Sequence, residues 1–279
     1  MFINPGDVEE DGSSAHIFYY ESYGRIKFDK QDTDPKFSLG YRFLNVSVDS
    51  SRADLDGAYN DVAVVGALQL GEAGDNDQWR VGLIAGAGSA NDDHWQHGDS
   101  YYGLGAVNFS RDLSQSEQLH LGISYDGNRA FMPDVPLPYV SYVNAENKNF
   151  IYIIGLPVSS VTWRPCEKLE LNMRYLAPVG FGAGASYFVT HRLAIFGEYD
   201  RSTGAFHEHD ATRDNQRLFY ELSTLTTGVK YHHDLADVRV GIGYAFDQEF
   251  SRGFDVRDTT TFASPTDEVL FFFTVSGTF

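Results

Sequence analysis

Apolar and polar residues alternate with a period of two along most of the chain, and this pattern predicts β-strands. In residues 37–43 the apolar side chains fall on one face and the small or charged ones on the other: Phe37, Leu39, Tyr41 and Phe43 against Ser38, Gly40 and Arg42. Continuing this strand to Val48 requires a register shift near residues 44–45, which predicts a β-bulge.

Alternating segments of this kind predict about thirteen strands, separated by turns and loops rich in Gly, Pro, Asn and Asp. They cover residues 15–28, 37–48, 61–70, 78–89, 101–111, 119–125, 150–164, 169–175, 182–189, 193–200, 218–231, 238–246 and 268–279. Short turns tend to alternate with longer loops, which is typical of an antiparallel barrel. We predict one β-barrel domain over residues 15–279, preceded by a flexible acidic segment over residues 1–14.

The last predicted strand has one strongly apolar face, formed by Phe271, Phe273, Val275 and Phe279. An exposed sheet edge this aromatic would aggregate in water. A strand with lipid on one side and water on the other needs one apolar face, and closure of a barrel removes the edge. The pattern therefore favours a transmembrane barrel. A soluble β-sandwich with its apolar faces turned inward is the alternative.

This terminal Phe279, preceded by apolar residues at alternate positions, resembles the insertion signal of bacterial outer-membrane β-barrels. Residues from about 156 to the end, starting LPVSSVTWRP, are also similar to a family of uncharacterised, transporter-like outer-membrane barrels, a resemblance that implies no activity. Together the resemblances imply a place in the bacterial outer membrane. The partners that they imply are the lipid bilayer with its lipopolysaccharide, the barrel assembly machinery and small solutes.

Bacterial single-chain barrels have an even number of strands. We therefore expect about twelve strands, with residues 15–28 not a full strand; the alternative is fourteen, with one long segment hiding another. The candidate hidden strand is residues 138–144, inside the irregular stretch 126–149, where prolines discourage a regular central strand. Otherwise we expect this stretch to be a long external loop, or one that folds inward and narrows the pore.

The chain holds 39 acidic and 21 basic residues, and its net charge of −18 argues against nucleic-acid binding. Most acidic residues fall in predicted loops, where we expect solvated surface; attraction of cations to a pore mouth and bridging by divalent ions are alternatives. Cys166 is the only cysteine, so no internal disulfide is expected. Residues 1–5 lack the features of a signal peptide, so the outer-membrane interpretation expects a mature or trimmed chain.

Charged residues on the inward faces of the predicted strands are the candidate lumen lining. They are Arg42, Arg80, Glu170, Arg174, Glu198, Asp200, Glu221 and Arg239. Charges removed from bulk water need partners or bound water. If they are paired and packed, the lumen is closed; if they are hydrated and spaced, they line a channel.

Catalytic, cofactor and metal sites are not expected. His120 and Ser124 share a strand face but lie roughly 13 Å apart, too far for a hydrogen bond. The segments 92–97 and 207–210 carry His and Asp at metal-ligand spacing, yet they would form a site only if the two loops met. Residues 54–61 resemble the start of a calcium loop, but Val65 stands where the glutamate ligand is required.

We therefore expect a porin-like passive channel for small hydrophilic or weakly apolar solutes, and not an enzyme. The first alternative is a closed barrel with a structural or partner-anchoring role. An outer-membrane hydrolase is the second alternative, and it would need a His within reach of a Ser or Asp at a rim of the barrel.

Overall fold

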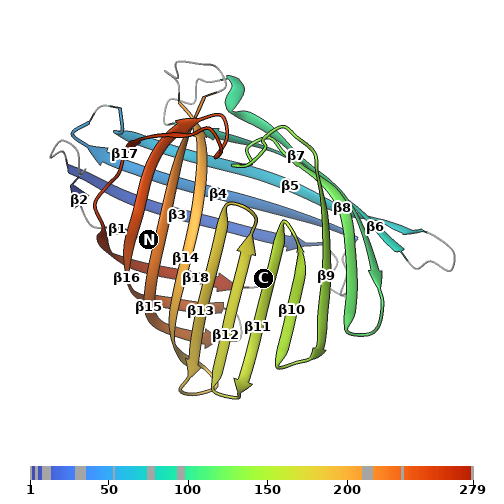
Figure 1. Cartoon of the computed structure of the whole chain (residues 1–279). Helices are drawn as coiled ribbons and strands as arrows, with labels where there is room; N and C mark the ends of the chain where they lie inside the picture. The colour runs from blue at the N-terminus through green and yellow to red at the C-terminus, as the bar shows by residue number, and fades with distance from the viewer. Residues whose placement is uncertain are drawn as a thin grey trace.

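The computed structural model describes residues 2–3, 6–7, 14–28, 36–52, 54–73, 79–92, 98–208, 216–233 and 236–277, which fold into a single all-β sheet (Figure 1). Its strands are β1 (Phe2–Ile3), β2 (Gly6–Asp7), β3 (Ser14–Lys27), β4 (Phe37–Ser50), β5 (Gly57–Ala73), β6 (Trp79–Asn91), β7 (Tyr101–Asp112), β8 (Glu117–Asp126), β9 (Leu137–Asn147), β10 (Phe150–Leu156), β11 (Val158–Cys166), β12 (Leu169–Leu176), β13 (Gly180–Phe188), β14 (Leu193–His207), β15 (Arg217–His233), β16 (Ala236–Gly253), β17 (Thr260–Ala263) and β18 (Glu268–Gly277). Among these residues the helical structure is one short turn, η1 (Gly98–Ser100). The described part of the chain thus contains no helix that is long and apolar enough to cross a membrane.

The sheet is closed in two ways. Each strand from β3 to β16 pairs with the next, β16 pairs with β18, and β1 contacts both β18 and β3. In addition, β14 meets β6 through one parallel pair, His207 with Asn91, and the Asp92 N–H donates to the His207 carbonyl at 3.0 Å. Nine strands, β6 to β14, thus form a closed ring, and seven outer strands continue the sheet: β15, β16, β18, β1, β3, β4 and β5. The predicted all-β barrel is confirmed in this form.

The two ends of the barrel differ in their connections. One end, called the turn end, carries short connections at residues 113–116, 148–149, 167–168 and 189–192. The other, called the loop end, carries the longer connections 127–136 and 254–267 beside short ones at 157 and 177–179. Strands β14, β15 and β16, with 15, 17 and 18 residues, are about twice as long as β10–β13, with 7 to 9.

Side chains on the outward faces are apolar and exposed. In β18 and β16, Phe271, Phe273, Val240 and Ile242 are each more than half exposed. Their neighbours on the inward face, such as Leu270 and Ala245, are fully buried. The apolar face predicted from the sequence for residues 238–246, and for the described part of 268–279, is thus the outer face of the barrel.

The inward faces of the outer strands and of β14 pack a hydrophobic core, called the inner core, towards the loop end. Figure 1 shows β14–β16 in front of β3–β5, which cross behind them at a large angle, and the inner core joins these two walls. It consists of Ile17, Val46, Val48, Leu55, Tyr59, Phe206, Leu218, Tyr220, Leu222, Ala245, Phe250, Ala263 and Leu270.

The register shift predicted at residues 44–45 is wrong. Strand β4 pairs with β3 and with β5 without irregularity, so Val46 and Val48 share the inward face with Arg42. The face changes from polar to apolar because its loop-end half packs in the inner core, where Val46 is 1% exposed. The inward residues of β4 therefore change from polar to apolar because their surroundings change along the strand, and β4 contains no bulge.

The strand count of twelve or fourteen is not confirmed, since fifteen strands have seven residues or more and β1, β2 and β17 are shorter. The predicted strand at 150–164 is two strands, β10 and β11, and β9 contains the candidate hidden strand 138–144. Strands β1 and β2 belong to the sheet, and residues 1, 4–5 and 8–13 lie outside the described part of the chain, so the flexible segment expected over residues 1–14 stays a prediction. Phe279 lies outside the described residues.

Candidate functional site

The inward face of the ring β6–β14 carries small and polar side chains. Strand register places Asn108, Gly122 and Tyr139 in one row across β7–β9, and the Tyr139 hydroxyl donates to Asn108 Oδ1 at 2.9 Å. A second row across β11–β14 holds Thr162, Asn172, Gly184 and Glu198. All these residues are partly exposed although they face inward. Water therefore reaches this face of the ring.

Two ion pairs lie on this face and on the adjoining strands. Arg174 of β12 donates to Asp200 of β14 at 2.8 Å, and Arg239 of β16 pairs with Glu198 of β14. The first pair spans β13 at Gly182, where a Cβ would lie 2.8 Å from Arg174 Nε, so glycine gives the arginine its path. The side chains of Arg174 and Asp200 are 67% and 33% exposed, so this pair is hydrated.

A more buried polar cluster lies where the ring meets the outer strands. Arg42 of β4 donates to Asp61 of β5 at 2.7 Å, and the Tyr102 hydroxyl of β7 donates to the other carboxylate oxygen. The Asp61 side chain is 6% exposed. Two donors compensate the cost of burying this carboxylate. The sequence pattern did not predict Asp61 and Tyr102 as partners of Arg42, because only the pairing of strands brings β4, β5 and β7 together.

Opposite walls approach each other at this level. Tyr23 of β3 lies directly opposite Arg42 in the register and is 74% exposed, and it interacts electrostatically with Arg174 of β12. Tyr19 of β3 likewise interacts with Asp200 of β14. Since β3 is distant from β12 and β14 in the sheet order, these side chains approach one another across the lumen.

The remaining predicted lining residues lie elsewhere. Arg80 pairs with Asp112 at 2.8 Å and Glu170 with Arg164 at 2.6 Å, both near the turn end. Glu221 pairs with Arg201 at 2.8 Å. Its prediction as a lining residue is corrected: Tyr220 and Leu222 on either side of it belong to the inner core, so Glu221 is on the opposite face.

Residues 127–136, between β8 and β9, fold inward, as one of the two sequence-based alternatives expected. Asn128 donates to the Ala205 carbonyl of β14 at 3.0 Å and lies 3.5 Å from Asp61 Oδ2. Ala130 packs with Ala205 and Phe219 of β14 and β15 in a second small core. The segment therefore reaches the wall formed by β14 and β15.

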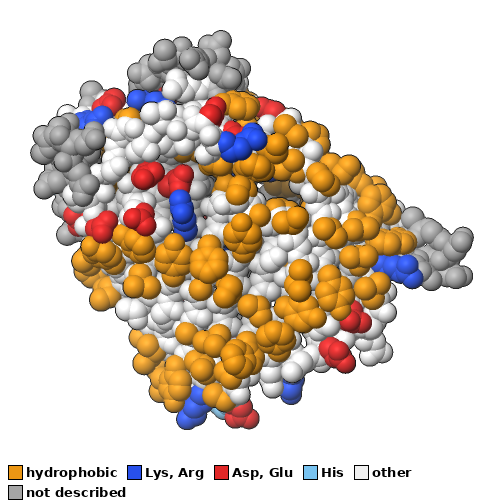
Figure 2. Space-filling model, viewed as in Figure 1, with side chains coloured by type: hydrophobic (Ala, Val, Ile, Leu, Met, Phe, Trp, Pro, Cys, Tyr) orange, Lys and Arg blue, Asp and Glu red, His pale blue; other side chains and the backbone are white. Residues whose placement is uncertain are grey.

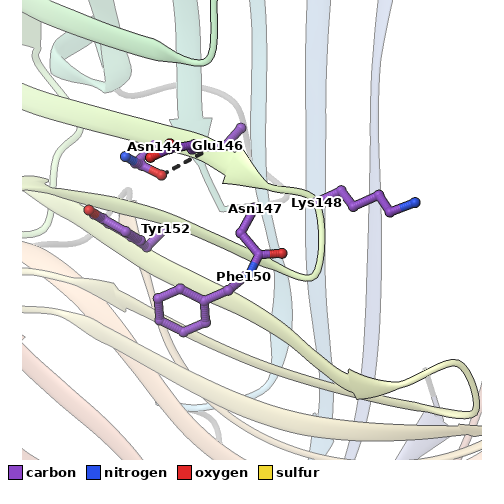
Figure 3. A pocket seen from close by; sticks show the side chains of 7 residues that line it. Asn144, Glu146, Asn147, Lys148, Phe150 and Tyr152 are labelled. Carbon is purple, nitrogen blue, oxygen red and sulfur yellow. Dashed lines mark hydrogen bonds between the residues drawn. The ribbon is translucent and has the colours of Figure 1, made fainter.

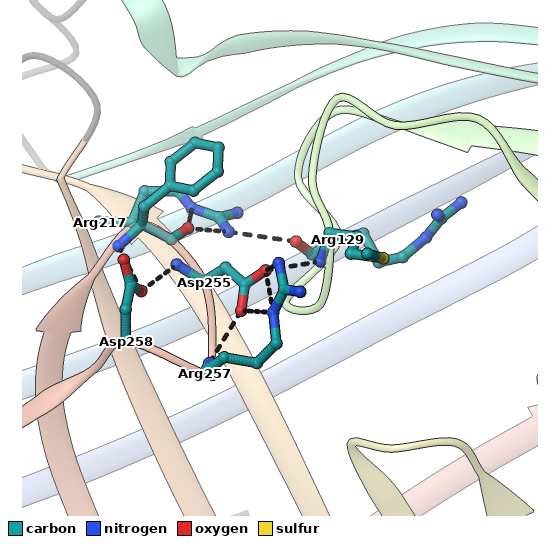
Figure 4. A network of polar contacts seen from close by, with 7 residues as sticks. Arg129, Arg217, Asp255, Arg257 and Asp258 are labelled. Atoms are coloured by element: carbon teal, nitrogen blue, oxygen red, sulfur yellow. Dashed lines mark hydrogen bonds and ion pairs between the residues drawn. The ribbon is translucent and has the colours of Figure 1, made fainter.

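A polar network joins this segment to the loop 254–258 (Figure 4). Arg217, at the start of β15, donates to the carbonyls of Phe254 and Arg129 and to Asn128 Oδ1. Asp255 accepts from the Met132 N–H at 3.0 Å and from Arg257. The hydrogen bonds from Arg257 lower the pKa of Asp255 to about 2, so this carboxylate stays charged at all but strongly acidic pH.

The described ends of the two His-bearing segments meet, through the pairing of His207 with Asn91 and the hydrogen bond from the Asp92 N–H to the His207 carbonyl. His94, His97, His209 and Asp210 lie outside the described residues. Within the part of the chain that is described, no group of three or more His, Cys, Asp or Glu residues is arranged to hold a metal ion.

His120 faces Ser110 and Ser141 across its neighbouring strands, an adjacency that the spacing to Ser124 did not reveal. No described side chain donates a hydrogen bond to its ring or accepts one from it. A hydrolase needs a base that is oriented by a partner. This arrangement therefore gives no support to the hydrolase alternative.

A shallow hollow, open to solvent, lies beside the turn between β9 and β10 (Figure 3). Phe150 and Tyr152 flank it, and Asn144 and Lys148 complete its edge. It lies at the turn end and is separate from the polar cluster of Arg42, Asp61 and Tyr102. Neither a family model nor a curated protein sequence matches the chain.

Proposed function

We propose that this chain is a bacterial outer-membrane β-barrel that works as a porin-like passive channel for small hydrophilic or weakly apolar solutes. The path runs through the ring β6–β14. One observation carries the proposal: the ring turns small polar side chains and a hydrated ion pair inward, and apolar side chains outward. A polar, water-accessible interior inside an apolar exterior is what a membrane channel requires.

The outer face supports the membrane setting. The outward residues of β16 from Val238 to Phe246 span about 26 Å along the strand, which at the usual tilt gives a band about 20 Å high. Arg201 pairs with Glu221 at the loop-end border of this band, while at the turn end Lys230 pairs with Asp237 on the inward face. Figure 2 shows the hydrophobic side chains spread over this face, with charged side chains gathered beyond them.

The number of membrane strands is part of the proposal. The nine ring strands and the seven outer strands make sixteen, an even number as in bacterial single-chain barrels. The short β1 runs antiparallel to both β18 and β3, so the alternation of strand direction is unbroken around the sheet. We place the turn end, where β18 finishes beside Ala236, on the periplasmic side.

A closed barrel with a structural or anchoring role is the second candidate. It is favoured by the inner core, which fills the space between the walls of outer strands, and by residues 127–136, which cover the loop end of the ring. The two candidates differ in whether solutes pass through the remaining polar interior.

Conductance in a planar bilayer distinguishes them. Refolded protein, with its insertion verified by protease protection in vesicles, is recorded with a salt gradient across the membrane. We expect small stepwise currents with a reversal potential that indicates cation selectivity, since the net charge is −18. Silence from folded, inserted protein and from a variant lacking residues 127–136 would contradict the channel.

A further inference from the structure

We propose that residues 127–136 form a lid that opens and closes the loop end of the ring, and that buried Arg217 holds the lid shut. The effect of the lid on the passage of solutes rests on the proposed channel function. The movement of the lid itself is testable without any conductance.

The lid crosses the ring from one wall to the opposite one. Counted around the ring, β8 and β9, which carry the lid, lie three and four strands from β14. Even so, Asn128 reaches the Ala205 carbonyl of β14, although it is only two residues past the end of β8. Two extended residues span at most about 7 Å. The ring is therefore narrow at this end, and a short segment is enough to cover it.

Arg217 connects the lid to a second loop. Arg217 is 2% exposed, and within the described residues it forms no ion pair with a carboxylate. Its guanidinium donates to the carbonyls of Arg129 and Phe254 and to Asn128 Oδ1. The guanidinium also lies 5.0 Å from the centre of the Phe219 ring. A buried cation is tolerated only while its hydrogen bonds are complete. Loss of either loop leaves it unsatisfied, so the lid and the loop 254–258 should open together.

Two further contacts tie the same loops. The Val256 N–H donates to the Ala130 carbonyl and the Met132 N–H donates to Asp255, both at 3.0 Å. Met132 and Asp134 have φ values of 50° and 59°, in the left-handed region that residues other than glycine rarely adopt. Such backbone strain persists only where the surroundings enforce it. Release of the ties therefore favours a different conformation of the lid.

Removal of Arg217 tests the lid. Arg217→Met keeps much of the side-chain length and removes the charge and the hydrogen bonds from Arg217 to both loops. We expect trypsin to cleave after Arg129 about tenfold faster than in the unaltered protein, the change that ~1.4 kcal/mol produces. The open probability in a planar bilayer should rise to a similar extent. Arg201→Met, which removes an ion pair of the same wall without touching the lid, is the matched control and should change neither.

A crosslink provides the converse measurement. Ala130→Cys with Val256→Cys, in a chain carrying Cys166→Ser, joins the lid to its partner loop where their backbones are hydrogen-bonded. In the Arg217→Met background, oxidation should restore slow cleavage and low open probability, and reduction should reverse both.

The outcomes separate the lid from the channel. Unchanged cleavage after Arg129 in folded Arg217→Met protein overturns the lid. Faster cleavage with no current in any variant keeps the lid and overturns the channel. Currents that are equal in the oxidised and reduced crosslinked protein overturn the control of flow by the lid.

Discussion

The two halves of this barrel share the same strand alternation and have opposite interiors. In the ring half, β7–β13, most inward residues are small or polar, and most are partly exposed. In the half formed by β14–β18 and β3–β5, the loop-end inward residues pack the inner core, and Phe206, Leu218 and Phe250 are fully buried. Alternation of apolar and polar residues thus shows that the two faces of a strand differ. Which of the two faces is apolar depends on what surrounds the strand.

Strand length accounts for this difference. Strands β10–β13 have 7 to 9 residues, close to the length that crosses a bilayer, and little remains for an additional layer of packing. Strands β14–β16 have about twice that length, and their additional residues at the loop end carry much of the inner core. The long half therefore provides most of the packing, and the short half keeps an open polar face.

The largest expected effect is on packing in the long half. Phe250→Ala empties a fully buried site stacked on Tyr220, with ring centres 4.7 Å apart, and we expect a loss of about 3–5 kcal/mol in the free energy of unfolding. Asn172→Ala, on the inward face of the ring, should cost less than about 1 kcal/mol. Urea unfolding in lipid vesicles, followed by tryptophan fluorescence, measures both. Equal losses of unfolding free energy in the two variants would contradict the difference in packing between the two halves.

A smaller effect is expected from filling the space above a ring glycine. Gly182→Val places side-chain atoms where Arg174 passes to Asp200, so the ion pair must break, and we expect a cost of about 1–2 kcal/mol and a reduced conductance. Gly197→Val, on the outward face of the neighbouring strand with no close contact, is the control. The same conductance in both variants would show that solutes do not pass Arg174.

The smallest effect on stability is expected from Arg174→Gln. The ion pair that it removes is largely exposed, so the free energy of unfolding should change by less than about 1 kcal/mol. The reversal potential should nevertheless shift towards greater cation selectivity, because a positive charge leaves the lining while Asp200 remains. Arg164→Gln, which removes a pair near the turn end, should shift it less. A reversal potential that does not move in Arg174→Gln would place the path elsewhere.

Much of the fold follows from local patterns. The alternation in residues 37–43, 169–175 and 238–246 predicts strands whose exposed apolar faces the structure bears out, and the antiparallel order follows from the short turns. Charged residues such as Arg174 and Asp200 were expected on the inward face, where they pair. The identity of these partners was not predictable, because it depends on Gly182 lying between them in the register.

By itself, then, the sequence determined most strand positions, the period of two and the all-β class, since these depend on neighbouring residues in the chain. Only the tertiary structure decided that Val46 and Val48 face inward, that Glu221 faces the other way, and that β14 meets β6. The same holds for the contact of residues 127–136 with Arg217. The physical reason is that burial and hydrogen bonding in these places come from segments far apart in the chain, and alternation carries no information on which distant segment covers a face.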